Sequence, residues 1–474
     1  MIGFLKDRWS CPGGYLQVLS LAFPLILSTG VWSVQLFVDR MFLSWYSAEA
    51  IAAATPAGII NFTVLSLFIG TVSYAGTFVA QYHGAGRPER IGPVLWQALY
   101  MSVFGGLFLL LFIPGARPLF ALIGHDPAVQ VHETAYLQAL CLGGFPIIAS
   151  AAMSGFFSGL GRAWPVMVIN TIQTIINVAL DYALIFGNWG CPELGVYGAG
   201  LASVAAACVS FFILVLLIGG TKANDRTFHT WRGWRLDPEL FSRLLRYGLP
   251  NGVQFFLDIC GFAVFVLVIG RIDAVSLAAT NIAFSINTLA FMPMIGSGIA
   301  ISILTGQYLG ANRPDLAEKS TYSGFHLTSV YMIVIAGAYV LVPQIFVLPF
   351  SIRGQGPLLD EIMALTVVLL RFVALYSIFD GMNIVFSAAI KGAGDTRYVM
   401  IFILLASVFV LIIPTFAAVS FFGLGLMACW IFATLYASLL GVVFYFRFRG
   451  GKWKKMRVIE TPGQPATSGP PSAA

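Results

Sequence analysis

Charge is scarce in this sequence. Only 10% of the 474 residues are Asp, Glu, Lys or Arg, whereas 58% are hydrophobic and the mean hydropathy is +0.87. Soluble domains carry about 25% charged residues, so this composition excludes an ordinary soluble protein and predicts a polytopic membrane protein. The opening charges Lys6, Asp7 and Arg8 lead into an apolar run much longer than a signal-peptide core, so no cleaved signal is expected.

Several chemical motifs are also missing. The six cysteines are scattered without CxxC spacing, and the five histidines show no HxxH-type spacing, so a protein-ligated metal site is not expected. The sequence GLGRAWP at 159–165 lacks the GKS or GKT ending of a phosphate-binding loop, so ATP is not expected to supply energy. The pI near 9.0 does not indicate nucleic acid, because the basic residues lie between membrane spans. No cofactor is expected.

Long apolar runs are abundant. A helix needs about 20 apolar residues to cross a bilayer, and Gly and Pro are tolerated inside such helices. The fold class predicted is therefore an all-α membrane protein with twelve transmembrane helices. The predicted spans are residues 16–44, 49–80, 92–114, 130–158, 164–187, 195–218, 244–270, 275–306, 321–346, 361–389, 398–420 and 422–446.

The basic residues gather on one side of the predicted membrane. The N-terminus, every even-numbered connection and the C-terminal tail hold 21 of the 26 Lys and Arg residues. By the positive-inside rule, both termini are expected in the cytoplasm, with the chain crossing the cytoplasmic (inner) membrane many times. The tail is basic and then rich in Pro, Gly and Ser, a composition typical of disorder.

The two halves of the chain repeat. A shift of 226 residues aligns QYHGAGRP, which begins at Gln81, with QYLGANRP, which begins at Gln307, and a shift of 233 pairs Gly159 with Gly392. Six spans per half insert both copies the same way up, related by a pseudo-twofold axis along the membrane normal, with substrate expected between them. The predicted domains are an N-lobe (1–218), a cytoplasmic linker (219–243), a C-lobe (244–447) and a disordered tail (448–474).

Four acidic residues lie well inside the predicted spans, two in each half: Asp39 and Asp181, then Asp258 and Asp380. A charged group at the bilayer centre costs roughly 2.5–3.5 kcal/mol, so such residues usually mark an ion or substrate path. Helix geometry places the second pair about halfway across the membrane and the first pair in its outer third. Two carboxylates brought close together share a proton unless a cation neutralises them, which is the property of an ion-coupled carrier.

The stretch from 170 to 187 surrounds one of these acids with other polar groups. Read as a helix, it places Asn170, Thr174, Asn177 and Asp181 on one stripe, at spacings of four, three and four. Such an oxygen-rich set suits a hard monovalent cation. The alternative is that the acids only pair with Arg, Asn or backbone groups to hold helices together, and that alternative stays open here.

Over residues 15–447 the sequence resembles the multidrug and toxic compound extrusion (MATE) transporters. The resemblance implies a V-shaped pair of six-helix lobes, not an enzyme, that exports organic cations or drugs in exchange for H⁺ or Na⁺. It implies a monomer with membrane lipid as its other partner. The matching segments are FPLILSTGVWSVQLFVDRMFLSW, QYHGAGRP, GFFSGLGRAWPVMVINTIQTIINVALDYALIFG, LGVYGAGLAS, YGLPNGVQFFLD, FMPMIGSGIAISILTGQYLGA and FDGMNIVFSAAIKGAGDT.

The resemblance also implies two candidate sites. The N-lobe cation-coupling residues of the family fall on Asp39, Asn177, Asp181 and Ser203, where relatives often have Thr at the last position. The C-lobe residues, for the coupling ion or the substrate, fall on Asp258, Tyr376 and Asp380, and relatives usually have Glu at the first of them. No metal is implied apart from Na⁺ at these same residues.

Three other functions stay in consideration. A lipid or polyprenyl-linked glycan flippase of related two-lobe architecture would need a strongly cationic cavity for pyrophosphate, whereas the ionisable groups inside these spans are mostly acidic. An intramembrane enzyme would need a clustered nucleophile or metal set, and none is found. A channel would not require two lobes with titratable sites.

Overall fold

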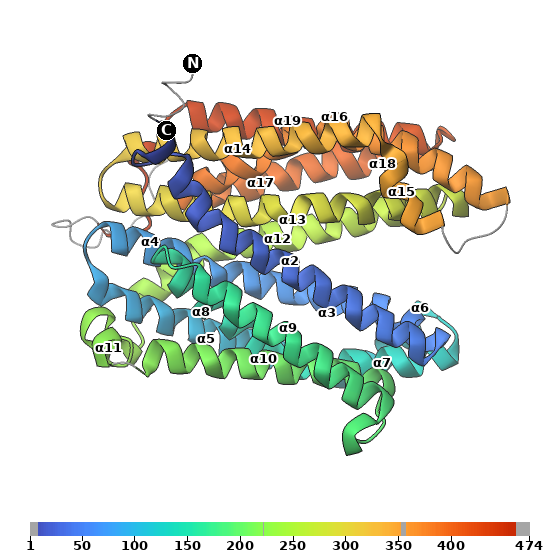
Figure 1. The fold of residues 1–474 in the computed structure, drawn as a ribbon, viewed down its shortest axis with the longest axis horizontal. Helices are drawn as coiled ribbons and strands as arrows, with labels where there is room; N and C mark the ends of the chain where they lie inside the picture. Colours follow the sequence, from blue (N-terminus) through green and yellow to red (C-terminus); the bar gives the residue numbers. More distant parts are fainter. Residues whose placement is uncertain (1–7, 221, 352–356, 461–474) are drawn as a thin grey trace.

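The structure is a computed structural model and describes residues 8–220, 222–351 and 357–460. Within these ranges the chain forms helices and turns without a strand. Figure 1 shows the long helices lying along one common direction in two groups, one built from the first half of the chain and one from the second. The first group forms the N-lobe and the second the C-lobe.

The N-lobe contains six spans. Two of them are broken: α3 continues into α4 at Tyr74, and α7 continues into α8 at Gly143 with a bend of 46°. Together with the short surface helix α6 (Phe112–Ile123), the elements are α2 (Tyr15–Tyr46), α3 (Ala48–Ser73), α4 (Ala75–Gly84), α5 (Ile91–Leu110), α7 (Pro127–Leu142), α8 (Gly144–Gly159), α9 (Trp164–Phe186) and α10 (Gly195–Gly219).

The C-lobe also contains six spans. Its fifth span includes a π-helical turn, η4 (Ser407–Ile412), between α17 (Thr396–Ala406) and α18 (Ile413–Ser420). The linker carries α11 (Lys222–Phe228), and α15 (Pro343–Ser351) lies between two spans. The remaining spans are α12 (Pro238–Ile269), α13 (Ala274–Gly310), α14 (Pro314–Leu341), α16 (Pro357–Ala393) and α19 (Leu426–Arg449).

The predicted spans are confirmed. Eleven helices of the described chain are long and apolar enough to cross a membrane, and the bent pair α7–α8 makes a twelfth. The largest differences are at the starts of α14, at Pro314 rather than 321, and of α12. For example, α12 begins at Pro238 rather than at 244, because the Asp237 side chain accepts a hydrogen bond from the Leu240 amide and caps the helix.

The lobes contact each other through equivalent helices. The first span, α2, packs against α13, and α12 packs against α3. A shift of 226 residues turns the first contact into the second. Close approaches between the helices follow the same rule: a Cβ on Gly70 would lie 2.7 Å from Gly252 Cα, and a Cβ on Gly296 would lie 2.6 Å from the Ile26 amide nitrogen. This repetition is what a pseudo-twofold relation between the lobes produces.

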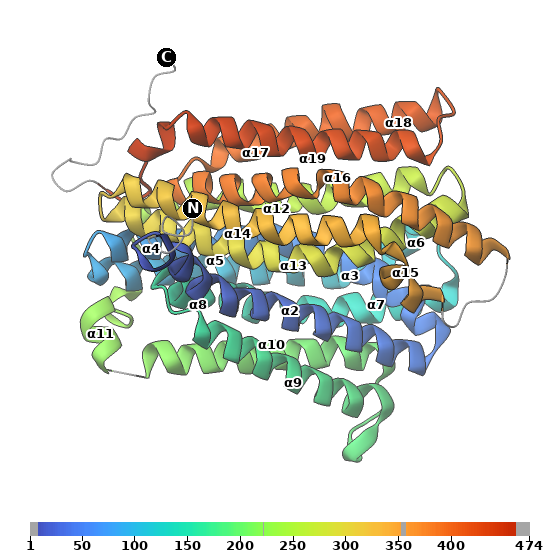
Figure 2. The same ribbon diagram turned by 45° about the horizontal axis from the view of Figure 1, so that its top comes forward.

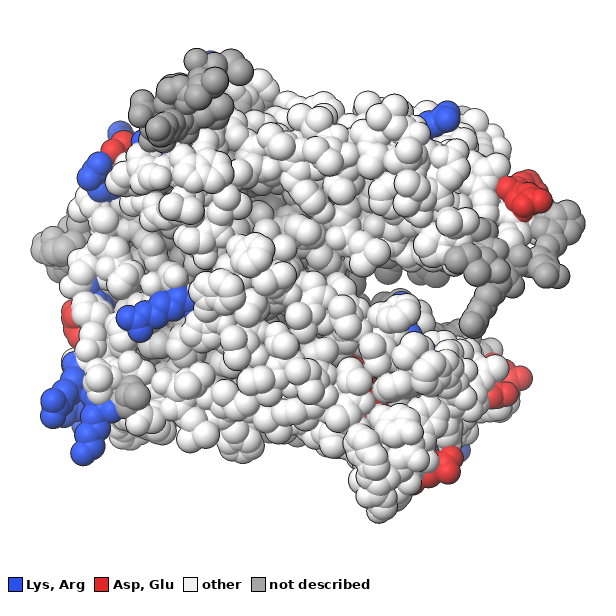
Figure 3. Space-filling view, in the orientation of Figure 1, with Lys and Arg blue, Asp and Glu red and all other residues white. Residues whose placement is uncertain are grey.

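Charged side chains gather at the two ends of the molecule. In Figure 3 most visible Lys and Arg residues lie at one end, most visible Asp and Glu residues lie at the other, and a broad uncharged band separates them. We call the first the basic end, which carries α11, the start of α12 and the turn after α4. The same view shows a hollow between the two halves at the opposite end.

The outer helices complete each lobe. Figure 2 shows α9 and α10 on one side of the molecule and α17 to α19 on the other. The two acid-bearing helices of the N-lobe, α2 and α9, contact each other directly. The fold thus brings together two segments that are more than 140 residues apart at Asp39 and Asp181.

Candidate functional site

A pair of buried carboxyl groups lies between α2 and α9. Asp181 is fully buried and Asp39 is only 7% exposed. The two carboxyl groups lie close enough to interact, and no donor among the described residues reaches Asp39 Oδ1 or either carboxyl oxygen of Asp181. Because two ionised carboxylates at such a site repel each other, the arrangement favours a proton on one partner or a neutralising cation.

Asn177 and Ser203 complete the predicted N-lobe set. Asn177 lies one helical turn before Asp181, is fully buried, and donates from Nδ2 to Ser203 Oγ on α10 at 3.3 Å. Its Oδ1 has no donor within the described residues. The structure therefore brings the four residues onto facing surfaces of three helices that touch one another. Four oxygen atoms of the Asp39, Asn177 and Asp181 side chains lack a donor there.

The polar stripe on α9 is matched by one on α2. Thr174 Oγ1 donates to Gln35 Oε1 at 3.3 Å, and Asn170 Nδ2 donates to Ser28 Oγ at 2.5 Å. The α9 stripe was predicted from the sequence, but Ser28 and Gln35 of α2 were not. Ser28 precedes Gln35 by seven residues and Gln35 precedes Asp39 by four, so all three lie on one helical face, and that spacing was the available signal. A polar seam thus runs along the α2–α9 contact and ends at the carboxyl pair.

Tyr136 and Arg40 are further neighbours of the pair. Tyr136 on α7 is 9% exposed and interacts electrostatically with both Asp39 and Asp181, and Arg40 interacts with both Asp39 and Tyr136. Nothing in the sequence separates Tyr136 from the other Tyr residues, because only the folded lobe brings α7 near these acids.

The C-lobe acids are arranged more loosely. Asp258 accepts a hydrogen bond from Gln254 Nε2 at 3.3 Å, and Asp380 lies near Asn383 of the same helix. The two acids interact electrostatically, but no hydrogen bond between them is present in the described chain. The Asp258 side chain is accessible although it lies well inside the span, so it is not enclosed by tight helix packing.

Tyr376 is buried one turn before Asp380, and its hydroxyl accepts a long hydrogen bond from Asn287 Nδ2 at 3.5 Å. Lys391, near the C-terminal end of α16, interacts electrostatically with Asp258. The C-lobe acid thus has a cation of the same chain beside it. In the part of the chain that the structure describes, no group of three or more His, Cys, Asp or Glu side chains is placed to hold a metal ion.

Aromatic side chains line the boundary between the lobes near Asp258. Phe255 lies one turn before Asp258 and packs edge-to-face on Phe62 of α3, with ring centroids 5.9 Å apart. Phe62 in turn contacts Trp32 of α2 at 5.6 Å. These rings come from both lobes, and the Trp32 side chain is 38% exposed.

Comparison with known proteins agrees with this architecture. The MatE family model matches residues 24–183 and 250–417, which is one match per lobe. The probable multidrug resistance protein NorM of Pseudomonas putida is 30% identical over 383 residues, covering 80% of this chain and 82% of that protein. The protein of the same name from Thermotoga maritima is 25% identical and covers 94% of both chains.

Solved structures share the fold. An outward-facing multidrug resistance MATE family transporter of the MOP superfamily superposes with a TM-score of 0.85 at 19% identity, covering 95% of this chain and 99% of that one. The eukaryotic MATE transporter AtDTX14 gives a TM-score of 0.82 at 18% identity, covering 93% and 96%. The family match to both lobes, the 30% identity over most of the chain and the shared fold together show that this protein is a member of the MATE transporter family.

Proposed function

We propose that this protein is a secondary active multidrug exporter that exchanges H⁺ or Na⁺ for small organic cations by alternating access. The names of its relatives support drug export. The observation that carries the coupling is the buried Asp39–Asp181 pair, three of whose carboxyl oxygens receive no donor among the described residues. A pair that must share a proton, or be neutralised by a cation, is suited to bind the coupling ion.

The orientation follows from charge. We propose that the basic end faces the cytoplasm, that both termini lie there, and that the protein is a monomer in the inner membrane. The hollow at the opposite end then opens to the outside, so the structure corresponds to an outward-open state. In this state an ion arriving from outside has a short route to the outer third of the N-lobe.

The ion acts on the packing of α2. An incoming H⁺ or Na⁺ neutralises the negative charge that remains on a pair sharing one proton, and this changes the contact between α2 and α9. Pro24 lies inside α2, and a helix bends most readily at such a position. Inward movement of one positive charge releases about 2.3 kcal/mol per 100 mV, which is available to expel a cationic drug against its gradient.

The substrate site is proposed at the lobe boundary. Flat organic cations can stack on the rings of Trp32, Phe62 and Phe255 through cation–π contacts, while Asp258 one turn further supplies negative charge. Lys391 offsets that charge when no drug is present. Asp380 and Tyr376 form the other side of this C-lobe site. A pyrophosphate-lipid flippase fits less well, because three of the four ionisable groups named here for the C-lobe site cannot carry positive charge.

The test is ethidium or norfloxacin efflux from vesicles under separately imposed pH and Na⁺ gradients. Efflux driven by one gradient and lost in Asp181→Asn supports the proposal. Normal efflux from Asp181→Asn would sink the coupling role of the pair. Efflux that needs neither gradient would sink the antiport mechanism.

A further inference from the structure

The chain after α19 folds back onto the basic end. At Gly451 the backbone turns with φ +72°, and the short helix η5 (Lys452–Lys455) follows. Trp453 is 1% exposed, stacks on Phe448 with ring centroids 4.7 Å apart, and donates from Nε1 to the Phe448 carbonyl. Lys454 Nζ pairs with Glu318 of α14 at 2.7 Å. This part of the segment is anchored on the C-lobe.

The sequence predicts disorder from residue 448, and residues 450–460 differ from that prediction. Their composition is basic, but the segment also contains Trp453 and Val458, whose apolar side chains are buried against the rest of the protein. The Pro-rich stretch 461–474 lies outside the described residues.

The segment then reaches the N-lobe. Val458 is 2% exposed and belongs to a hydrophobic cluster that contains Phe78 of α4 and Leu240 of α12, so residues of both lobes surround it. Its amide donates to Gln81 Oε1 of α4 at 2.9 Å. Two residues later, the Glu460 carboxylate also lies at the contact between the lobes.

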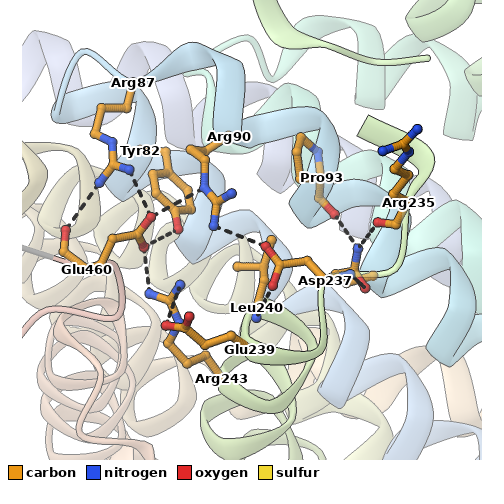
Figure 4. A network of polar contacts seen from close by, with 11 residues as sticks. Tyr82, Arg87, Arg90, Pro93, Arg235, Asp237, Glu239, Leu240, Arg243 and Glu460 are labelled. Atoms are coloured by element: carbon orange, nitrogen blue, oxygen red, sulfur yellow. Dashed lines mark hydrogen bonds and ion pairs between the residues drawn. The ribbon is translucent and has the colours of Figure 1, made fainter. Parts of the chain in front are cut away.

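Glu460 is the centre of a cationic cluster, shown in Figure 4. From the N-lobe, Tyr82 Oη donates to its carboxylate at 2.6 Å, Arg87 Nη2 at 2.9 Å, and Arg90 Nε lies 3.3 Å away. From the C-lobe, Arg243 Nη1 donates at 2.6 Å. Arg243 lies near the start of α12, whose capping residue Asp237 also pairs with Arg90 at 3.3 Å.

The cluster is built for a negative charge. Burial raises the pKa of the Glu460 carboxyl, but the hydrogen bonds from Tyr82 and Arg243 outweigh it and bring the pKa to about 2. The side chain is 28% exposed, so these contacts are only partly screened by solvent. Without the carboxylate, three guanidinium groups from two lobes would face one another across the contact, and their repulsion would favour separation.

We propose that Tyr82, Arg87, Arg90 and Arg243 form a carboxylate-binding site divided between the two lobes. Its ligand is Glu460 of the same chain. Occupancy holds the basic end closed, and the site must release Glu460 before the lobes part at that end. The site does not depend on which ion drives transport or on which drug is carried. The experiment that tests this proposal therefore measures distances between the lobes and does not require a transport assay.

The experiment is a spin-label distance measurement on the full chain in lipid nanodiscs. Labels are placed at Arg162→Cys in the N-lobe and Arg397→Cys in the C-lobe, two exposed positions at the basic end. The background replaces the four partly exposed cysteines, which are Cys11, Cys191, Cys208 and Cys260, and keeps the two buried ones.

Glu460→Gln is expected to at least double the population of longer distances. The matched control is Glu239→Gln. Glu239 also pairs with Arg243, at 3.6 Å, but it sits on the same helix and its side chain is 58% exposed, so its removal breaks no link between lobes. A Glu460→Gln distribution equal to that of Glu239→Gln overturns the proposal.

A second variant tests the same site independently, in case Glu460→Gln does not fold. Arg243→Gln removes the C-lobe side of the site and is expected to shift the distances in the same direction. The double variant Glu460→Gln/Arg243→Gln should open no further than either single variant, because both remove the same contact. Additive shifts would show that the two residues act independently and would overturn the shared site. If Glu460→Gln does not fold, Arg243→Gln against Glu239→Gln decides the question.

Discussion

Gln81 and Gln307 make the same hydrogen bond in opposite directions across the lobe contact. Gln81 Nε2 of the N-lobe donates to the Gly392 carbonyl of the C-lobe at 2.9 Å, and Gln307 Nε2 of the C-lobe donates to the Gly159 carbonyl of the N-lobe at 2.8 Å. All four residues belong to the repeated motifs of the two halves. The repeated sequence motif therefore corresponds to a hydrogen bond between the lobes that the chain makes twice at its basic end.

The two glutamines differ in one respect. Gln81 is fully buried and also accepts from the Val458 amide, whereas Gln307 is partly exposed. A buried hydrogen bond contributes about 1 kcal/mol net, and orphaned partners add to the loss. Gln81→Ala is therefore expected to lower the thermal stability of the purified protein more than Gln307→Ala. Equal melting temperatures for the two variants would contradict the role given to Val458.

The carboxyl pair gives the sharpest functional prediction. Asp181→Asn should abolish ion-driven efflux while leaving expression and fold intact, because Asn keeps the size of the side chain but cannot hold the ion's charge. The rate of drug efflux from vesicles under an imposed H⁺ or Na⁺ gradient measures this loss. The control is Glu361→Gln, which changes an exposed acid at the start of α16 and should leave efflux unchanged.

The polar seam predicts a partial effect. Gln35→Ala removes the acceptor of the Thr174 hydroxyl one turn from Asp39 and should weaken, not abolish, coupling. A loss of about 1 kcal/mol corresponds to roughly fivefold weaker apparent affinity for the coupling ion. Thr174→Val should give a similar change. The double variant should be no worse than the more affected single variant, and full additivity would show that the two side chains do not act together.

Replacing Lys391 is expected to increase the affinity for a cationic substrate. Removing the ammonium group in Lys391→Gln leaves the Asp258 carboxylate without its cationic neighbour, so an organic cation is attracted more strongly. Ethidium binding to the detergent-solubilised protein should tighten several-fold, and Asp258→Asn should weaken it. Unchanged binding in both variants would remove Asp258 from the substrate site.

Glu460 predicts a pH dependence with a definite sign. Its pKa is lowered from 4.5 to about 2 in the folded protein. A lowered pKa means that the stabilisation is fully present above pH 4.5 and is lost as the pH falls through 2. The difference in melting temperature between the wild type and Glu460→Gln should therefore be constant from pH 8 to pH 5 and shrink below that. A difference that already shrinks between pH 8 and pH 6 would contradict the assignment.

The spans could be predicted because bilayer thickness fixes helix length, so apolar runs alone locate them. Their ends could not, since a cap such as Asp237 sets the start of α12 independently of hydropathy. The acids of the N-lobe were visible as rare charges in apolar runs. Gln35 was not, because its role depends on which face α2 turns toward α9.

The Glu460 cluster was invisible for a different reason. Tyr82 and Glu460 are 378 positions apart, and no period in the sequence connects them. The repeat could not reveal it either, because the segment follows only the second half. Composition pointed to disorder there, and two apolar side chains with one carboxylate were enough to produce an ordered segment instead.

The distance in sequence between Tyr82 and Glu460 also bears on how the protein is made. Tyr82 is synthesised with the second span, whereas Glu460 is translated only after α19, the last described span, has been synthesised. Until then Arg87, Arg90 and Arg243 have no carboxylate from this segment to bind. The contact of Glu460 with both lobes therefore forms late in biogenesis, and a chain that terminates before residue 460 lacks the carboxylate that joins them.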